Sequence, residues 1–368
     1  MDRVYKKISW TDEFSIGNKE MDNDHKQLID IFNNLIDIAE KNLPGSGFAE
    51  QLSHMTDYSL RHMTKEEWYL RSIDFPDIAE HKKQHLDYIK TTALFNSRFL
   101  TDNPPTITEV IDFLRIWWTN HIMNIDIQYE IHNREKILDR VRSQLQELSS
   151  ERNRISGERF FKERVNIYGV KTAEVTKVAK ERYTDLSLYS KKVIFEMCES
   201  LFKTQYLEES FIACDWVYRN RSSFEKSDFD VFERWIDSYI KNWATCDTFC
   251  NHSVGAFIEE FPEYIKDLKR WALSNNLWVR RAAAVSLIIP ARKGLFLTDI
   301  LEISSTLLLD KDDMVQKGYG WLLKVTSDKH LQEIFEFVMN NKDSMPRTSL
   351  RYAIEKMPND YKKQAMAK

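Results

Sequence analysis

Two short stretches, Arg61-His-Met-Thr-Lys-Glu-Glu-Trp68 and His81-Lys-Lys-Gln-His85, indicate how the first third of the chain folds. Each stretch places two metal-binding side chains four residues apart: His62 with Glu66, and His81 with His85. Four residues turn an α-helix by about 400°, so each pair lies on one face of its helix, one turn apart. Two helices that present such pairs to each other can hold a metal centre between them.

Helical periodicity extends outward from these stretches and predicts four helices. Apolar residues recur at helical spacing in four segments: about 20–43, about 48–72, about 77–101, and from Glu109 onward. Turn-forming residues separate the segments: Asn42-Leu-Pro-Gly-Ser-Gly47, Phe75-Pro76 and Asn103-Pro-Pro105. Helices of about 20 residues with short connections predict an up-down-up-down four-helix bundle over residues 1–135.

Possible metal ligands lie on all four predicted helices: His25, His62, Glu66, His81, His85, His121 and Asp126. Imidazole and carboxylate ligands suit iron, and a carboxylate can bridge two metal ions whereas an imidazole cannot. A single histidine on a helix usually faces solvent or belongs to the core. Six of the nine histidines, however, fall in the first third, which favours two iron ions inside the bundle. We expect the sixth, His54, to be structural or to face solvent.

Together with Trp10-Thr-Asp-Glu-Phe-Ser-Ile-Gly17 and Met21-Asp-Asn-Asp-His25, these ligand positions resemble a bacterial hemerythrin over about residues 5–135. The resemblance implies a non-haem di-iron centre with the following ligands: His81, His85 and His121 on one iron, His25 and His62 on the other, and Glu66 and Asp126 as bridges. It also implies an open coordination position for O₂ or a similar small ligand. The ligand set differs from the carboxylate-rich Glu-x-x-His sites of ferritin-like enzymes, which favours O₂ binding over O₂ activation.

The composition of the chain excludes several classes of protein. The 368 residues include only 9 Gly and 8 Pro, which favours an all-α fold. No apolar run approaches the ~20 residues that span a bilayer, and the N-terminus has no signal-peptide core. The four cysteines form no Cys-x-x-Cys motif, so we expect reduced, buried thiols: Cys198, Cys214, Cys246 and Cys250. These features predict a cytoplasmic protein without a membrane partner; its oligomeric state is not indicated.

Charge is distributed unevenly along the chain. Residues 1–150 contain 18 basic and 25 acidic side chains, whereas the remainder contains 35 and 32. A mildly basic second part permits a nucleic-acid-binding face without demonstrating one. Residues 136–157 are predicted to be a charged helical linker, with a narrow apolar stripe on an otherwise solvated helix: Ile137, Leu138, Val141, Leu145 and Leu148.

Residues 158–368 show only helical periodicity. The predicted helices are 187–203, 206–219, 228–240, 255–274, 277–289, 297–309, 312–325, 330–340 and 347–357. Several pair at an irregular spacing of about 35–40 residues, which is typical of an α-α superhelix of HEAT-like repeats with a concave surface. This pattern alone predicts a binding scaffold, most simply one for protein partners.

Four segments of this part resemble the DNA alkylation repair glycosylases, a HEAT-like family that excises N3- and N7-alkylated purines from double-stranded DNA. The segments are Asn242-Trp-Ala-Thr-Cys-Asp247, Trp278-Val-Arg-Arg-Ala-Ala-Ala284, Gln316-Lys-Gly-Tyr-Gly-Trp-Leu-Leu-Lys324 and Met345-Pro-Arg-Thr-Ser-Leu-Arg-Tyr-Ala-Ile-Glu355. The resemblance implies that Asp247 is the catalytic aspartate. It further implies two aromatics beside the lesion, Trp243 and Trp321, and an adjacent arginine, Arg281. Ala244 departs from the family pattern, where an aspartate is common.

The residue types at this site suit excision of a cationic base. An N-alkylated purine is a good leaving group, and a carboxylate such as Asp247 stabilises the positive charge that develops on the sugar. Tryptophan faces attract cations, and we expect Arg281 and neighbouring basic residues to hold phosphates. Two glycines inside the helix around Trp321 each cost about 1 kcal/mol, which indicates close helix packing or close ligand approach.

The sequence is compatible with two functional interpretations of the whole chain. In the first, a di-iron O₂-binding or O₂-sensing domain is fused to an alkylpurine DNA glycosylase. In the second, an O₂ or redox sensor, or an iron-binding protein, carries a catalytically silent scaffold that binds DNA or protein. Oxidative dealkylation by the irons is disfavoured, because seven protein ligands leave little room for a substrate.

Overall fold

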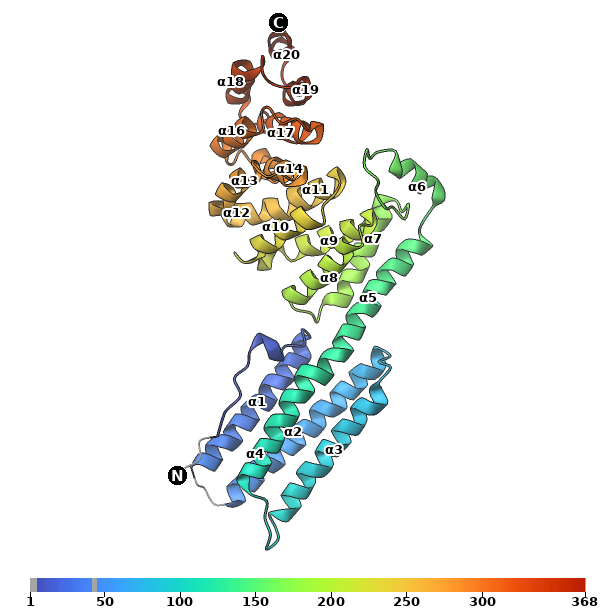
Figure 1. The fold of residues 1–368 in the computed structure, drawn as a ribbon, viewed down its shortest axis with the longest axis vertical. Helices are drawn as coiled ribbons and strands as arrows, with labels where there is room; N and C mark the ends of the chain where they lie inside the picture. Colours follow the sequence, from blue (N-terminus) through green and yellow to red (C-terminus); the bar gives the residue numbers. More distant parts are fainter. Residues whose placement is uncertain (1–4, 42–44, 368) are drawn as a thin grey trace. The chain divides into compact units, whose positions relative to one another are not determined.

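A computed structural model describes residues 5–41 and 45–367 of the chain (Figure 1). Helices make up 75% of the structure and the described residues contain no β-strand, which confirms the predicted all-α fold. Packing divides the chain into two compact units: Met1–Asp139 with Asp185–Val193, and Arg140–Thr184 with Ile194–Lys368. The domain limits at residues 135 and 158 remain predictions.

The first unit is the predicted four-helix bundle. The 3₁₀ turn η1 (Asp12–Phe14) comes first in the chain and is followed by the helices α1 (Lys19–Glu40), α2 (Gly45–Ser72) and α3 (Ile78–Arg98). The fourth helix is continuous and consists of α4 (Ile107–Asn120), the π-helix η2 (His121–Asp126) and α5 (Ile127–Glu147). Asn18 caps α1 by accepting hydrogen bonds from two backbone amides of its first turn. Residues 42–44 of the predicted first turn lie outside the described residues.

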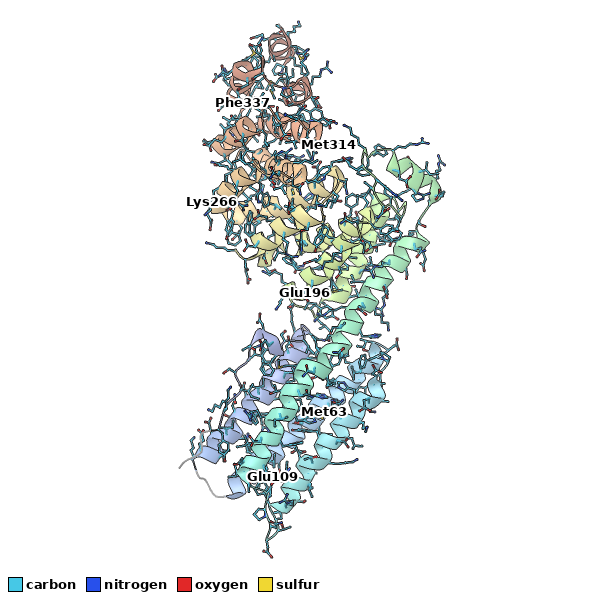
Figure 2. The ribbon with its side chains drawn as sticks, in the orientation of Figure 1. Met63, Glu109, Glu196, Lys266, Met314 and Phe337 are labelled. Atoms are coloured by element: carbon cyan, nitrogen blue, oxygen red, sulfur yellow. The ribbon has the colours of Figure 1, made fainter. Side chains whose placement is uncertain are left out.

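The bundle core is formed by the apolar faces of these helices. Leu28 and Leu35 from α1, Leu52 and Met63 from α2, and Leu114 from α4 are all buried. Met63 lies between the helices, in the interior of the bundle (Figure 2). Each buried methylene contributes about 0.8 kcal/mol, so the burial of these side chains stabilises the bundle.

The second unit is a row of stacked helices. One series packs each helix on the next, in the order α7 (Thr172–Tyr183), α9 (Leu207–Arg219), α11 (Trp243–Phe249), α14 (Leu277–Val285), α17 (Asp313–Thr326) and α19 (Arg347–Ile354). The remaining α-helices are α6 (Glu151–Glu158), α8 (Lys191–Lys203), α10 (Asp228–Ser238), α12 (Gly255–Glu260), α13 (Ile265–Trp271), α15 (Ile288–Arg292), α16 (Leu297–Thr306), α18 (Leu331–Asn341) and α20 (Asn359–Met366). The short elements are η3 (Thr184–Leu186), η4 (Arg221–Ser223), the π-helix η5 (Cys250–Val254) and η6 (Pro262–Tyr264).

Two features of the second unit differ from the sequence prediction, and a third agrees with it. The helix predicted over 255–274 breaks at Pro262, which has no backbone N–H to continue the helix. Helices α7, α11 and α20 were not predicted, because each is short and its apolar face is narrow. The four cysteines are free and buried, as predicted.

The linker prediction is wrong in one respect. Four residues of its apolar stripe are buried, namely Ile137, Leu138, Val141 and Leu145, whereas Leu148 is exposed. This part of α5 therefore contributes to cores rather than forming a solvated connection. The helix ends at Glu147, and α6 begins after a short break.

The two glycines inside α17 are explained by close packing. A Cβ added to Gly318 would lie 3.3 Å from the Arg281 Cγ. A Cβ added to Gly320 would lie 2.8 Å from the Tyr352 Cβ and 2.9 Å from the Ser349 carbonyl oxygen on α19. Gly320 thus allows α17 and α19 to approach each other closely.

We expect Gly320→Ala to lower the free energy of unfolding of the second unit by about 1 kcal/mol or more, because the overpacking cost exceeds the gain in helix propensity. The matched control is Gly47→Ala in α2, where an added Cβ meets nothing within 4 Å. That substitution should stabilise the chain by up to about 1 kcal/mol. Thermal midpoints of both variants check the prediction, and an unchanged or raised midpoint for Gly320→Ala would contradict it.

Candidate metal centre and candidate base-excision site

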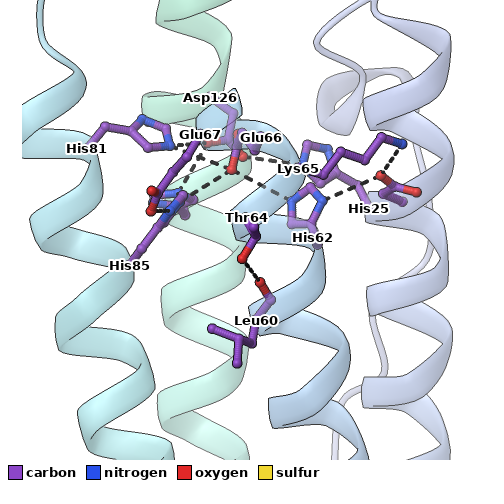
Figure 3. Close-up of polar contacts among 12 residues, drawn as sticks. His25, Leu60, His62, Thr64, Lys65, Glu66, Glu67, His81, His85 and Asp126 are labelled. Carbon is purple, nitrogen blue, oxygen red and sulfur yellow. Dashed lines mark hydrogen bonds and ion pairs between the residues drawn. The ribbon is translucent and has the colours of Figure 1, made fainter. Parts of the chain in front are cut away.

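The seven predicted metal ligands are buried and converge inside the bundle, and Figure 3 labels all of them except His121. Four of them form two pairs at ordinary helical spacing, His62 with Glu66 and His81 with His85, but His121 and Asp126 are five residues apart. In an α-helix this spacing would turn the two side chains about 140° from each other. The π-helix η2 has wider turns, with i→i+5 hydrogen bonds, and brings the His121 Nε2 within 3.2 Å of the Asp126 Oδ1.

Two groups of nitrogen ligands share the same carboxylates. Ligand atoms of Glu66, His81, His85 and His121 lie within 4.8 Å of one another, and so do those of His25, His62 and Glu66. Asp126 also faces both groups. Its Oδ2 lies 3.3 Å from the His25 Nε2, and its Oδ1 lies 3.7 Å from the His81 Nε2. Both carboxylates are therefore positioned between two sets of imidazoles.

The environment of these ligands fits metal ions. No hydrogen-bond partner reaches the buried ring nitrogens of His25 and His62 or the carboxylate oxygens of Glu66 and Asp126. Buried polar atoms without partners are costly, and a bound cation would satisfy them. Burial lowers the pKa of His25, His62 and His121, which favours the neutral imidazole that metals require.

The pKa values of the two carboxyl groups are shifted in opposite directions. Burial and the charge of Glu66 raise the pKa of Asp126 well above its usual range. Burial acts in the same direction on Glu66, but contacts from His81 and His85 outweigh it and hold the pKa of Glu66 well below its usual range. Two carboxylates this close and this buried do not both ionise without nearby cations. Bound metal ions would supply that positive charge.

Two further acidic residues orient the ligands and were not identified from the sequence. Asp24 places its Oδ2 3.7 Å from the His62 Nδ1, and Glu67 places its Oε1 3.4 Å from the His85 Nδ1. A proton on Nδ1 facing these carboxylates leaves Nε2 free, and Nε2 is the nitrogen that faces Glu66 in both histidines. Each acidic residue directly neighbours a ligand in the sequence, which was the available signal. His54 is exposed and takes no part.

In the second unit, Asp247 is held by Arg281. The Nε and Nη2 of Arg281 each donate a hydrogen bond of 2.8 Å to one oxygen of the Asp247 carboxylate. A third guanidinium nitrogen of Arg281 donates to the Met314 carbonyl. Arg281 is 5% exposed, so the expectation that it holds phosphates is wrong; it fixes the carboxylate instead. Burial raises the pKa of Asp247, and the ion pair with Arg281 opposes this effect.

The two predicted tryptophans are placed differently. Trp243 lies one turn before Asp247 on α11, half-buried, and its indole N–H donates to the Phe160 carbonyl. The Phe161 ring stacks on it, with centroids 5.7 Å apart. Trp321 is half-buried on α17, and among the described residues no hydrogen bond or ring contact joins it to Asp247 or Trp243. Sequence reasoning missed Phe161, which lies far from α11 in the sequence.

A helical bundle with a histidine and carboxylate centre, followed by stacked helices with a buried Asp–Arg pair, defines a two-domain helical protein. The family model for DNA alkylation repair enzymes matches residues 141–357, and that for the hemerythrin HHE cation-binding domain matches residues 17–129. The chain therefore belongs to the DNA alkylation repair enzyme family and carries a hemerythrin-like domain, which confirms both resemblances.

Individual relatives agree with these matches. Bacteriohemerythrin of Clostridium acetobutylicum is 29% identical over 124 residues, which is 33% of this chain and 96% of that protein. Bacteriohemerythrin of Pseudomonas aeruginosa strain LESB58 is 28% identical over 146 residues, 40% of this chain and 89% of that protein. A predicted DNA alkylation repair enzyme from Enterococcus faecalis shares the fold, with a TM-score of 0.53 and 14% identity, over 57% of this chain and 97% of its own.

These matches establish a hemerythrin-like domain, which implies non-haem iron binding, joined to a domain of DNA repair enzymes. None of the helices in the described residues is long and apolar enough to cross a membrane.

Proposed function

We propose that the first unit binds two iron ions and a diatomic ligand such as O₂, and that the second unit is a DNA glycosylase that releases N3- and N7-alkylated purines from double-stranded DNA. The first half of the proposal is carried by Glu66, which belongs to both groups of histidine ligands. The second half is carried by Asp247, whose two oxygens are fixed by Arg281 on a half-buried helix face.

His81, His85 and His121 would hold one iron ion, and His25 and His62 would hold the other, with Glu66 and Asp126 available to both. Two iron ions bound there would supply a site for reversible binding of a small diatomic ligand. Asp24 and Glu67 fix the ring orientation of His62 and His85, which keeps Nε2 directed toward Glu66. The ligands are buried, so the protein excludes bulk water from the centre.

The chemistry proposed for Asp247 is electrostatic. An N-alkylated purine carries positive charge, so the bond from the sugar C1′ to the base nitrogen breaks with its electron pair going to the base. The sugar then develops positive charge, which a fixed carboxylate stabilises. Water adds its oxygen to C1′ and loses a proton to solvent. Arg281 positions Asp247, and Trp243 and Trp321 offer aromatic faces to the cationic base.

The test of this function is release of 7-methylguanine from a methylated duplex by the full chain. The expected result is a time-dependent release that exceeds the spontaneous rate. A chain that binds the duplex without releasing base would instead support a silent DNA-binding scaffold. A chain with no salt-dependent DNA affinity would point to a protein-binding scaffold.

The pH dependence of base release follows from the environment of Asp247. Burial raises the pKa of this carboxyl above the ordinary value of 3.8, and only the ionised form stabilises a sugar cation. Release should therefore fall as the pH is lowered, with a midpoint above 3.8, and level off at higher pH. Rates measured across the acid range check this, after correction for spontaneous depurination. A rate independent of pH down to 3.8 would contradict the proposed role.

A further inference from the structure

Nine residues of the chain, Asp185–Val193, pack as part of the four-helix bundle although they follow α7 and include the start of α8. The backbone of Tyr189 forms an antiparallel bridge with Asn18. The Lys19 amide donates to the Leu188 carbonyl at 2.8 Å, and the Ser190 amide donates to the Gly17 carbonyl at 3.2 Å. The segment thus pairs, through backbone hydrogen bonds, with the residues at the start of α1.

Gly17 makes this approach possible. Its φ is +89°, a conformation that favours glycine. An added Cβ would lie 2.3 Å from the Val193 Cγ2 and 2.5 Å from the Arg134 Nη2, so a larger residue would force these side chains to move. The sequence of the bundle is therefore adapted to holding residues 185–193 at this position.

Tyr189 is the anchor of the segment. Its side chain is 1% exposed, and its hydroxyl accepts a hydrogen bond of 2.7 Å from the Asn133 Nδ2. The same amide nitrogen donates to the Tyr69 hydroxyl at 2.9 Å. Beside them, Glu130 is buried and accepts a hydrogen bond of 2.8 Å from the Asn18 Nδ2. We call Asn18, Tyr69, Glu130 and Asn133 the anchor cluster.

The anchor cluster belongs to the same elements as the metal ligands. Tyr69 follows Glu66 by three residues on α2, and Glu130 follows Asp126 by four. Asn18 is the N-cap of α1, the helix that carries His25. Ring contacts also connect the anchor cluster to a predicted metal ligand. The centroid of the Tyr129 ring lies 5.8 Å from that of Tyr69 and 5.8 Å from that of His81.

We propose that the anchor cluster is a docking site for residues 185–193 of this chain, and that metal in the bundle strengthens the hold on Tyr189. The inference rests on the metal-binding half of the proposed function and not on base release. Metal ions would join α1, α2 and η2 through their ligands and so fix the spacing of the anchor residues. Without cations, unpaired buried carboxylates favour a looser arrangement of those same helices. The coupling is reciprocal, so a firmly docked segment raises metal affinity.

Hydrogen exchange of the full chain tests this without DNA. Exchange of the Lys19 and Ser190 amides is compared between protein loaded with ferrous iron under anaerobic conditions and protein stripped by a chelator. We expect iron to slow both amides by about fivefold or more, a typical coupling between linked sites. The Ile36 amide, on the same helix α1, serves as the internal reference and should change less.

Either of two results would overturn the proposal. One is equal exchange of the Lys19 and Ser190 amides with and without iron. The other is a slowing that Ile36 shares by the same factor, which would mean a general tightening of the bundle. A variant adds a second readout, because Tyr189→Phe removes the hydroxyl that accepts from Asn133. It should weaken ferrous iron binding by about fivefold, whereas Tyr361→Phe, whose hydroxyl donates to the exposed Gln332, should leave the affinity unchanged.

Discussion

Replacing Asp247 with asparagine should lower the rate of 7-methylguanine release by about 100- to 1000-fold, the usual loss when one preorganised electrostatic group is removed from an active site. Asparagine keeps the size of the side chain and can still accept a hydrogen bond from Arg281. It loses the negative charge that faces the sugar cation. The single-turnover rate on a methylated duplex measures the effect, because that rate reports the chemical step rather than product release.

The control for this prediction is Asp328→Asn. Asp328 pairs with Lys356 at 2.9 Å on the surface, so its loss should leave base release unchanged. Thermal midpoints of both variants are needed, since Arg281 is buried and a weakened partner destabilises the fold. A folded Asp247→Asn protein that releases base at the wild-type rate would remove Asp247 from the proposed chemistry.

Replacing Glu66 with glutamine should lower the iron content from about two ions per chain to about one or none, because a neutral amide does not bridge two metal ions. Glu66 belongs to both groups of possible ligands, since its carboxylate oxygens lie within reach of both sets of histidines. The change is small in volume, and the surrounding core is unaffected. Iron per chain, measured after anaerobic loading and gel filtration, gives the stoichiometry.

The neighbouring residue provides a matched comparison. Glu67→Gln alters the carboxylate of the next residue on the same helix. That carboxylate contacts the Nδ1 of His85. This variant should keep about two iron ions but bind them about 10- to 100-fold more weakly, as expected for loss of an orienting group. Equal iron content and equal affinity in Glu66→Gln and the wild type would exclude the bridging role.

The bundle and its ligands were predictable from the sequence because the signals are local. Pairs such as His62 with Glu66 lie one helical turn apart, and the helix period alone places them on one face. The apolar period likewise fixes the inner face of each helix. His121 and Asp126 were counted as possible ligands on the fourth helix, but the helix period did not place them on one face, since a spacing of five does not suit an α-helix.

The features that escaped prediction depend on contacts between segments distant in the sequence. Burial of Arg281 follows from the packing of α14 against α11 and α17, and no local pattern separates it from a surface arginine. Phe161 reaches Trp243 across more than eighty residues of chain. The sequence of the docked segment 185–193 has no local pattern that predicts its packing on the bundle, and the positive φ of Gly17 that accompanies this packing is visible only in the structure.

The π-helix at His121–Asp126 amounts to one extra residue inserted into an otherwise continuous helix. Every residue after it is rotated by about 100° relative to an uninterrupted α-helix. Asp126 closes the π-helix and Glu130 and Asn133 follow it, so a single-residue deletion within 122–125 would turn Asp126 and these two members of the anchor cluster away together. The metal centre and the docking of residues 185–193 therefore depend on the same helical register.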